Sequence, residues 1–248
     1  METQKLNQTF PQTGERNEER LRKAHPEEVL VSQPGFDVLM MRYDSAIREV
    51  RTKLEILNDE LSFSGMSNPI SSIISRRKDP ASIYEKLVRQ KNEISLPSIE
   101  ANLNDVAGIR VICPFLDDIY KVAKMLVQQD DVTLIHTKDY IRRPKPNGYR
   151  SYHMIVEVPV FFSQEKRPMR VEVQIRTVAM DFWANLEHRM KYKQDLSQKS
   201  VDAIYRDLRE CAETIAETDY RMQEIRDRIS ELEGVNQEGG KQEGGQGS

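Results

Sequence analysis

Between Ile70 and Tyr192 the sequence switches repeatedly between an apolar period of two and an apolar period near 3.6 residues. This switching restricts the fold more than any other feature, because each segment has one apolar face that a neighbour must cover. Strands are predicted over residues 70–78, 106–115, 132–141, 152–161 and 169–175, and helices over 80–89, 117–128 and 178–192. The pattern therefore predicts an α/β (α+β) domain built on a single mixed β-sheet.

Long amphipathic helices are predicted on both sides of this domain. Apolar residues recur at steps of three and four from Phe36 to Leu61, and the same rhythm returns after Ser197. The second stripe consists of Val201, Ile204, Leu208, Cys211, Ile215, Met222, Ile225, Ile229 and Leu232. It extends over roughly 30 residues, or about 45 Å, and charged residues flank it. We therefore expect a homo-oligomer held by its terminal helices; the alternative is that both stripes pack on their own domain.

The two ends of the chain are polar and show no sustained periodicity. Segments of this kind bury too little apolar surface to fold, so a disordered arm and a disordered tail are expected. The predicted organisation is an arm at 1–33, a domain with its N-terminal helix at 34–195, an oligomerisation helix at 196–233 and a tail at 234–248.

The composition favours a cytoplasmic protein without membrane contact. No segment approaches the roughly 18 apolar residues of a membrane helix, and residues 1–20 lack the apolar stretch of a secretory signal. The chain holds two cysteines, Cys113 and Cys211, each in an apolar periodic segment. Two buried thiols are therefore expected rather than a disulfide or a thiolate zinc cage.

The charge distribution favours small anions as ligands. A net charge of −3 argues against a protein that coats nucleic acid. Basic residues nevertheless gather within 138–150 and at 76–78. Local basic clusters on an acidic protein are typical of sites for small, highly charged anions, and the alternative is a solvated charged face.

The segment 170–176 carries the clearest chemical signal. Strand side chains alternate between faces, and one face of this segment carries Arg170, Glu172, Gln174 and Arg176. Asp105 stands at the entry to the predicted strand 106–115, where its carboxylate can lie near Glu172. Two carboxylates with arginines nearby form a site for Mg²⁺ with a polyphosphate. The alternatives are a solvent-facing strand and a turn or cap role for Asp105.

The loop 144–153 is the other informative stretch. Asn147-Gly148 supplies a tight turn. Tyr149 follows it directly and can offer its ring to a base, with Lys145 and Arg150 placed for phosphates. The alternative is that Tyr149 is a packing anchor.

These segments form a set of motifs in a fixed order. The motifs are Arg76-Arg-Lys78 with Ser82 and Lys86, Asp105-Val-Ala-Gly-Ile-Arg110, Asn147-Gly-Tyr-Arg-Ser-Tyr-His153, and Val171-Glu-Val-Gln-Ile-Arg-Thr177 followed by Phe182-Trp183 and Glu187-His188. On these motifs the chain closely resembles the synthetase domain of the RelA/SpoT-like alarmone synthetases, which is nucleotidyltransferase-like. Within that family it looks like a small alarmone synthetase.

The resemblance implies transfer of the β,γ-pyrophosphoryl group of ATP to the 3′-hydroxyl of GTP or GDP, giving (p)ppGpp in the stringent response. Asp105 and Glu172 correspond to the family's magnesium carboxylates, and Glu172 is also placed to take the proton of the 3′-hydroxyl. The residues that correspond to the ATP side are Arg76, Lys78, Ser82, Lys86, Arg89 and Arg110. Those on the guanosine-phosphate side are Lys138, Lys145, His153 and Gln174, with Tyr149 as the guanine-stacking tyrosine.

The resemblance also implies synthesis without hydrolysis. Bifunctional relatives carry an upstream His-Asp metal domain, and none of the four histidines here is followed by Asp. Small members commonly form tetramers, and some are regulated by their own product. They carry asparagine where this chain has Asp181, which leaves the role of Asp181 open. The alternatives are a single-stranded RNA-binding regulator on the same fold, for which paired carboxylates have no use, and an inactive scaffold.

Overall fold

The computed structural model describes residues 25–63, 68–191 and 198–242, and its centre is a five-stranded sheet with the order β1-β2-β5-β4-β3. The strands are β1 (Ser72–Arg77), β2 (Ala107–Cys113), β3 (Thr133–Asp139), β4 (Tyr152–Phe161) and β5 (Lys166–Thr177). β2 and β5 run parallel, and the other neighbouring pairs are antiparallel. The predicted single mixed sheet is therefore confirmed.

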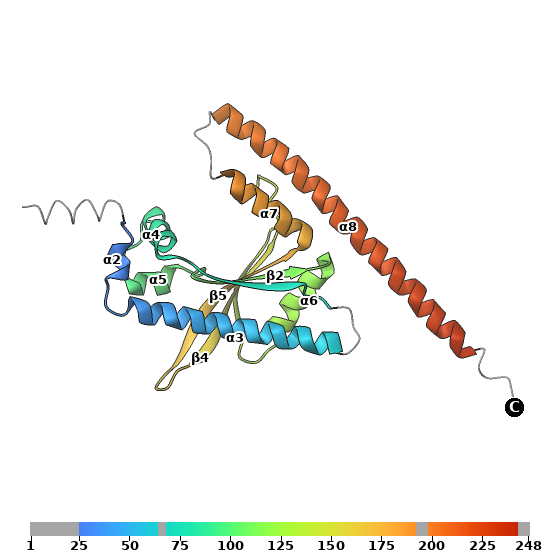
Figure 1. Ribbon diagram of the computed structural model, residues 1–248, viewed down its shortest axis with the longest axis horizontal. Helices are drawn as coiled ribbons and strands as arrows, with labels where there is room; N and C mark the ends of the chain where they lie inside the picture. Colours follow the sequence, from blue (N-terminus) through green and yellow to red (C-terminus); the bar gives the residue numbers. More distant parts are fainter. Residues whose placement is uncertain (1–24, 64–67, 192–197, 243–248) are drawn as a thin grey trace, which may run out of the picture.

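The helices lie around this sheet and at its ends (Figure 1). They are α2 (Glu28–Val31), α3 (Phe36–Phe63), α4 (Pro80–Arg89), α5 (Leu96–Asn102), α6 (Leu116–Val127), α7 (Val178–Lys191) and α8 (Gln198–Gln242). α3 contacts β1, β2, β4 and β5, and runs below the sheet in Figure 1, whereas α7 and α8 lie above it. The polar face of β5 lies on the side of the sheet on which α7 lies, since Arg176 pairs with Asp181 of α7.

The alternation within β5 separates the core from the site. Val171, Val173 and Ile175 have no exposed surface and join one apolar cluster with residues of α3 and α6. The side chains between them are polar and half-buried or buried. Burying the apolar half supplies the driving force for folding, and the polar half remains for a ligand.

Helix caps fix the two short helices that border the site. The Asp79 carboxylate accepts a hydrogen bond from the Ser82 amide at 2.8 Å, and Pro80 stands in the first turn of α4. Ser95 caps α5, which the apolar periodicity did not predict. The signal was present in the sequence, because Ser95 is followed by Pro97 within the first turn.

Three expectations about the ends and the cysteines need correction. Leu30 in α2 is fully buried, so residues 25–33 belong to the fold and not to a disordered arm. α8 continues to Gln242, past the start of the predicted tail at 234. The remaining arm (1–24) and tail (243–248) and the predicted boundary at 195–196 lie outside the described residues. Cys211 is exposed because it faces away from the domain, whereas Cys113 is buried and both thiols are free.

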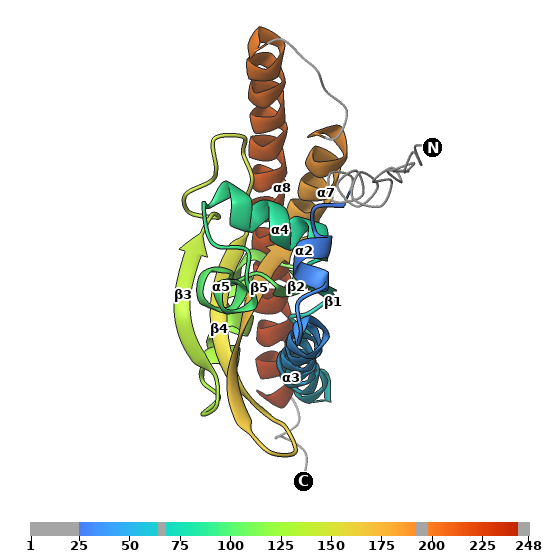
Figure 2. The ribbon, with the colours of Figure 1, turned by 90° about the vertical axis from the view of Figure 1, so that its left-hand side faces the viewer.

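α8 runs along the domain (Figure 2), and apolar packing, a hydrogen bond and an ion pair attach it. Trp183, Ala184 and Ala212 form a second apolar cluster with Leu208 and Ile215 packed against it. Thr177 Oγ1 donates to Asp219 at 2.6 Å, and Arg226 binds both carboxylate oxygens of Asp117. Among the described helices, none combines the length and apolar composition that crossing a bilayer requires.

Candidate active site

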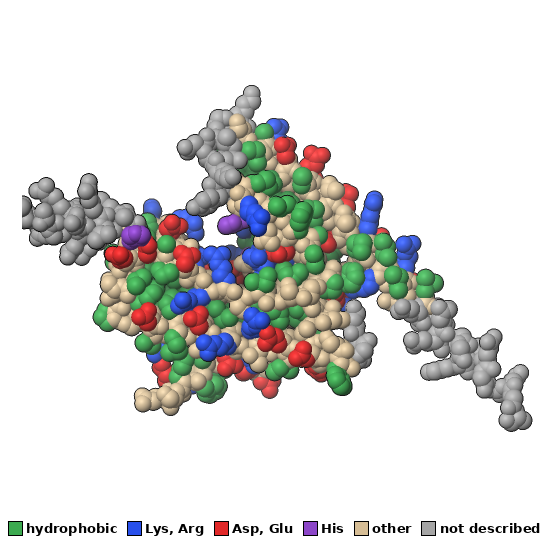
Figure 3. Space-filling model, viewed as in Figure 1, with side chains coloured by type: hydrophobic (Ala, Val, Ile, Leu, Met, Phe, Trp, Pro, Cys, Tyr) green, Lys and Arg blue, Asp and Glu red, His purple; other side chains and the backbone are tan. Residues whose placement is uncertain are grey.

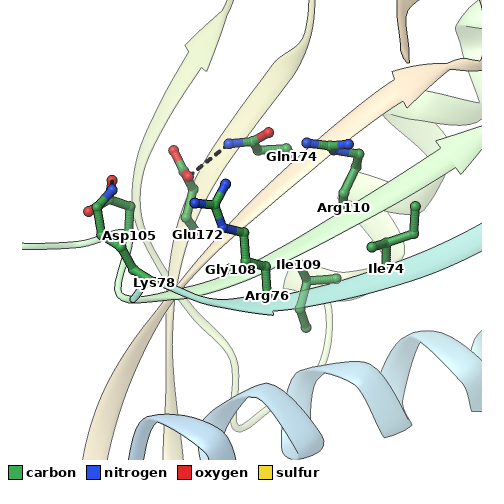
Figure 4. A pocket seen from close by; sticks show the side chains of 9 residues that line it. All are labelled: Ile74, Arg76, Lys78, Asp105, Gly108, Ile109, Arg110, Glu172 and Gln174. Atoms are coloured by element: carbon green, nitrogen blue, oxygen red, sulfur yellow. Dashed lines mark hydrogen bonds and ion pairs between the residues drawn. The ribbon is translucent and has the colours of Figure 1, made fainter. Parts of the chain in front are cut away.

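Strand register aligns the candidate residues in two rows across the sheet. One row contains Ile74, Arg110, Gln174, His153 and Lys138, one from each strand. The neighbouring row contains Arg76, Gly108, Glu172, Ile155 and His136. Residues in register on adjacent strands share a face, and Figure 4 shows Arg76, Arg110, Glu172 and Gln174 on the same side of the sheet, whereas Ile109 points away. Segments far apart in the sequence thus meet on one polar surface.

Asp105 lies just before β2, between two lysines. Lys78 Nζ is 2.8 Å from its Oδ2, and Lys86 Nζ is 2.7 Å from its Oδ1. Burial acts to raise the pKa of the Asp105 carboxyl, but the two lysines outweigh burial and hold the pKa below its usual value. Asp105 is therefore an ionised carboxylate at neutral pH.

Glu172 lies on β5 with both of its oxygens engaged. His153 Nδ1 is 3.2 Å from Oε1, and the Gln174 amide donates to Oε2 at 2.9 Å. Burial acts to raise the pKa of Glu172, and these hydrogen bonds lower it by more, so the group stays ionised. An ionised carboxylate in a partly buried position can accept a proton or bind a cation.

The two carboxylates separate two cavities and line both of them. The first, of about 380 Å³, is bordered by β1 and β2 and is lined by Ile74, Arg76, Lys78, Asp105, Gly108, Ile109, Arg110, Glu172 and Gln174. The second, of about 340 Å³, reaches towards β3 and is lined by Lys86, Gln90, Asn102, Asn104, Asp105, His136, Lys138, Tyr140, Lys145, His153, Ile155 and Glu172. Figure 3 shows Lys and Arg side chains gathered at the hollow below α7. Two anionic ligands could therefore meet at Asp105 and Glu172.

The residues expected on the ATP side fall into three groups. Arg76, Lys78 and Arg110 line the first cavity, whereas Lys86 lines the second. Ser82 and Arg89 line neither. The Ser82 amide and hydroxyl both bind the Asp79 cap at the N-terminus of α4.

The residues expected on the guanosine side are also divided. Lys138, Lys145 and His153 line the second cavity, and Gln174 lines the first. Tyr149 lines neither, because its ring is covered. The Lys145 ammonium lies 4.5 Å from the centroid of the Tyr149 ring and 4.8 Å from that of the Tyr140 ring.

Several residues of the site were not predicted. His136 and Tyr140 line the second cavity beside Lys138, and the three alternate along 136–140. A period-two reading of that segment would have placed them on one face. Asn102 and Asn104 had no comparable signal, because the end of α5 and the loop after it bring them to the cavity.

Arg176 and Asp181 form an ion pair behind the cavities. Arg176 is 4% exposed, and its Nη1 donates to Asp181 Oδ1 at 3.1 Å. The same Asp181 oxygen lies 3.2 Å from Arg110 Nη1. Asp181 is thus the shared counterion of two arginines, one of which lines the first cavity.

The carboxylate oxygens of Asp105 and Glu172 fit a hard metal cation that takes its other ligands from water or from a bound nucleotide. Within residues 25–63, 68–191 and 198–242, no group of three or more His, Cys, Asp and Glu could hold a metal ion. Asp105 and Glu172 supply two carboxylates, which matches Mg²⁺, an ion that keeps water or phosphate oxygens as further ligands.

Comparison with known proteins gives the following similarities. Residues 75–197 match the family model described as the region found in RelA and SpoT proteins. The GTP pyrophosphokinase YwaC of Bacillus subtilis is 39% identical over 192 residues, which are 77% of this chain and 90% of that protein. The GTP pyrophosphokinase YjbM of the same organism is 35% identical over 198 residues, 80% of this chain and 92% of that protein.

Solved structures show the same similarity. The small alarmone synthetase 1 of Bacillus subtilis bound to its product pppGpp superposes with a TM-score of 0.71 and 34% identity, covering 79% of this chain and 98% of that one. The same synthetase bound to AMPCPP gives a TM-score of 0.65 and 31% identity, covering 79% and 99%. The fold and the sequence relationship therefore agree.

Proposed function

This chain belongs to the RelA/SpoT family, and on that premise we propose that it is a GTP pyrophosphokinase that makes (p)ppGpp. The 3′-oxygen of GTP or GDP forms a bond to the β-phosphorus of ATP, and the bond between the α,β-bridging oxygen and that phosphorus breaks. AMP leaves, and the guanine nucleotide gains a pyrophosphate. The activity is synthesis alone, since none of the four histidines begins a His-Asp pair.

One observation carries this proposal: Asp105 and Glu172 line both cavities. Pyrophosphoryl transfer depends on positioning two polyanions and on neutralising their charge where they meet. ATP occupies the first cavity, beside Arg76, Lys78 and Arg110. The guanine nucleotide occupies the second, beside Lys138, Lys145 and His153.

Glu172 accepts the proton of the 3′-hydroxyl in this mechanism. The carboxylate is ionised, stands between the cavities and has His153 and Gln174 to hold its orientation. Lys78 and Lys86 offset the charge of Asp105 and lie close enough to turn towards phosphate oxygens. Mg²⁺, held by Asp105 and Glu172, would neutralise negative charge on the transferred group.

Tyr149 provides the stacking surface for guanine once Lys145 moves to the phosphates. The ammonium above its ring marks a face that already attracts a flat or cationic group. Ser82 and Arg89 complete the ATP side from α4. A cytoplasmic location also belongs to the proposal, because the nucleotide substrates are found there.

We propose in addition that the protein is a homotetramer held by its terminal helices. The second half of α8 leaves Met222, Ile225, Ile229 and Leu232 between 41% and 66% exposed. An apolar strip of this length favours a partner helix. RNA and the alarmone product are the candidate regulators.

The decisive experiment incubates the purified protein with labelled ATP, Mg²⁺ and each of GTP, GDP and GMP, then identifies the products. We expect AMP together with pppGpp or ppGpp. ATP hydrolysis without a pyrophosphorylated guanine nucleotide would contradict the proposal. Titration with single-stranded RNA tests the alternative, in which RNA binds tightly and no nucleotide product forms.

A further inference from the structure

The buried guanidinium of Arg176 contacts two residues, Gln174 and Tyr149, that connect it to the carboxylate of Glu172. Its Nη2 donates to Gln174 Oε1 at 2.7 Å and to Tyr149 Oη at 2.6 Å. Its Nε donates to Ser151 Oγ at 3.3 Å, and its Nη1 donates to Asp181. A buried arginine needs such a counterion, and its fork directs several hydrogen bonds at once.

Two chains of hydrogen bonds lead from Arg176 to Glu172 and end on different oxygens. In the short chain, Gln174 accepts from Arg176 and donates to Glu172 Oε2 at 2.9 Å. In the long chain, Tyr149 Oη lies 2.9 Å from His153 Nε2, and His153 Nδ1 lies 3.2 Å from Glu172 Oε1. Both carboxylate oxygens therefore depend on one guanidinium.

The directions of these bonds follow from which groups can only donate and which can only accept. Arginine only donates, so the oxygen of the Gln174 amide faces Arg176 and its NH₂ faces Glu172. Glu172 only accepts when ionised, so the proton of His153 stands on Nδ1. In the neutral imidazole Nε2 is then the acceptor, and the hydroxyl of Tyr149, whose oxygen already accepts from Arg176, donates to it.

We propose that Arg176, with Asp181 as its counterion, is the positioning residue that fixes the orientation of Glu172 and the tautomer of His153. This positioning role of Arg176 rests on the proposed function in one respect, namely that Glu172 is the group that accepts the proton. Asp181 thereby has a structural function: it neutralises the buried Arg176 and pairs with Arg110.

The first test reads the tautomer directly, by nitrogen-15 NMR of the imidazoles in nucleotide-free protein. Only four histidines occur, and His153→Gln assigns the signal. We expect the Nδ1–H tautomer in the unchanged protein and a mixture of tautomers in Arg176→Met. An Nε2–H tautomer in the unchanged protein would overturn the proposal. Because no nucleotide is needed, this result decides the network even in a protein that makes no product.

The second test is kinetic and uses a variant that keeps the charge. Arg176→Lys retains a positive charge beside Asp181, so it should fold, but it lacks the planar guanidinium that donates to several partners at once. The variant should therefore lose kcat by about 10- to 100-fold, the range seen when a residue that hydrogen-bonds a metal ligand is replaced. The KM for ATP should stay unchanged, because Arg110 keeps Asp181. Arg167→Met is the matched control, since it removes an arginine 2.6 Å from Glu100, away from both cavities. Arg176→Lys with normal kcat and a normal His153 tautomer would refute the role.

Discussion

At the scale of single residues, the site consists of charges that neutralise one another until substrates arrive. Asp105 is paired with Lys78 and Lys86, and the ammonium of Lys145 rests on two aromatic rings. Each of these cations is held by an acid or a ring, and phosphate oxygens can replace that partner without leaving the cation unpaired. This arrangement keeps a basic cavity stable in the absence of nucleotide.

The two carboxylates give the most direct prediction. Asp105→Asn and Glu172→Gln keep the shape of each side chain and remove its charge, so synthesis should fall by at least about 100-fold. Activity assays and thermal unfolding on the same samples check this. Glu157→Gln is the matched control, because Glu157 pairs with Arg170 at 3.5 Å and lines neither cavity. A variant that keeps more than a small fraction of the activity would remove that residue from the reaction.

Tyr149 allows its ring and its hydroxyl to be separated. Tyr149→Ala should weaken guanine-nucleotide binding by about 1–3 kcal/mol, the value of one stacked base, and leave the KM for ATP unchanged. Tyr149→Phe keeps the ring and loses the bonds to His153 and Arg176, so it should lower kcat and leave both KM values near normal. Equal losses for both substrates in the alanine variant would indicate a collapsed loop instead.

At the scale of elements, α8 forms the support of the loop 142–148. Gly148 has φ +90°, and a Cβ there would lie 2.5 Å from the Cβ of Ala212. Trp183 Nε1 donates to the carbonyl of Leu208 at 3.0 Å, which joins α7 to α8. The guanine side of the site is therefore attached to a helix that is distant in sequence.

Gly148→Ala should disturb this attachment. The substitution combines a strained φ with a steric clash, so it should cost more than about 1 kcal/mol of stability. We expect a raised KM for the guanine nucleotide and an unchanged KM for ATP. Ala212→Gly in the same chain removes the contact at 2.5 Å but leaves the 3.1 Å approach to the Arg209 backbone and the strained φ, so it should restore the KM only in part. Full activity in Gly148→Ala would show that the loop does not depend on α8.

The ion pair between Arg226 of α8 and Asp117 of α6 predicts a pH dependence of stability. Burial acts to raise the pKa of Asp117, but hydrogen bonds from Arg226 and Lys121 outweigh burial and lower the pKa to about 2. A lowered carboxyl pKa stabilises the fold above the unfolded value of about 3.9, and this stabilisation disappears as the pH falls towards 2.

Arg226→Met measures that contribution. At pH 7 the variant should lose about 1 kcal/mol of unfolding free energy, allowing for the solvent that screens this partly exposed pair. The difference from the unchanged protein should shrink between about pH 4 and pH 2. Urea denaturation at several pH values provides the measurement. A difference that stays constant down to the lowest pH would show that the pair with Asp117 is not the cause.

At the scale of the whole molecule, α8 is longer than the domain that it packs on (Figure 1). Leu208 and Ile215, which the periodicity placed in an intersubunit seam, pack beside Trp183 in their own chain. Ile225 and Ile229 lie farther along and are 41% and 51% exposed. We therefore propose the second half of α8 as the part that an assembly uses.

Ile225→Glu with Ile229→Glu should dissociate the proposed tetramer without unfolding the domain. Light scattering should give a mass near four times the 28.9 kDa chain for the unchanged protein and near one chain, or two, for the variant. Leu208→Glu should instead lower the Tm, because it disrupts the packing around Trp183. An unchanged protein with the mass of a single chain at micromolar concentration would contradict the assembly.

The sequence by itself determined the strands, the main helices and the polar face of β5. The reason is local: side chains alternate in a strand and repeat every three to four residues in a helix. It also placed Asp105 at the start of β2, so two carboxylates on one surface could be expected from the pattern of residues alone. Helix α5 was not predicted, because its seven residues are too few to show an apolar period. Only the cap at Ser95 and the proline at 97 marked it in the sequence.

Only the tertiary structure decided which of these residues meet. The register of β1, β2, β5, β4 and β3 aligns the two rows of the site, and register is set by long-range packing that no single segment contains. α8 packs against Trp183 and Ala184 through the face that carries Ala212, and Cys211 lies outside that face and is exposed. Which face of a helix packs depends on the surface that it meets, and that surface comes from another part of the chain. The hydrogen bonds of Arg176 depend on segments that the folded sheet brings together, and this is why its role became visible only in three dimensions.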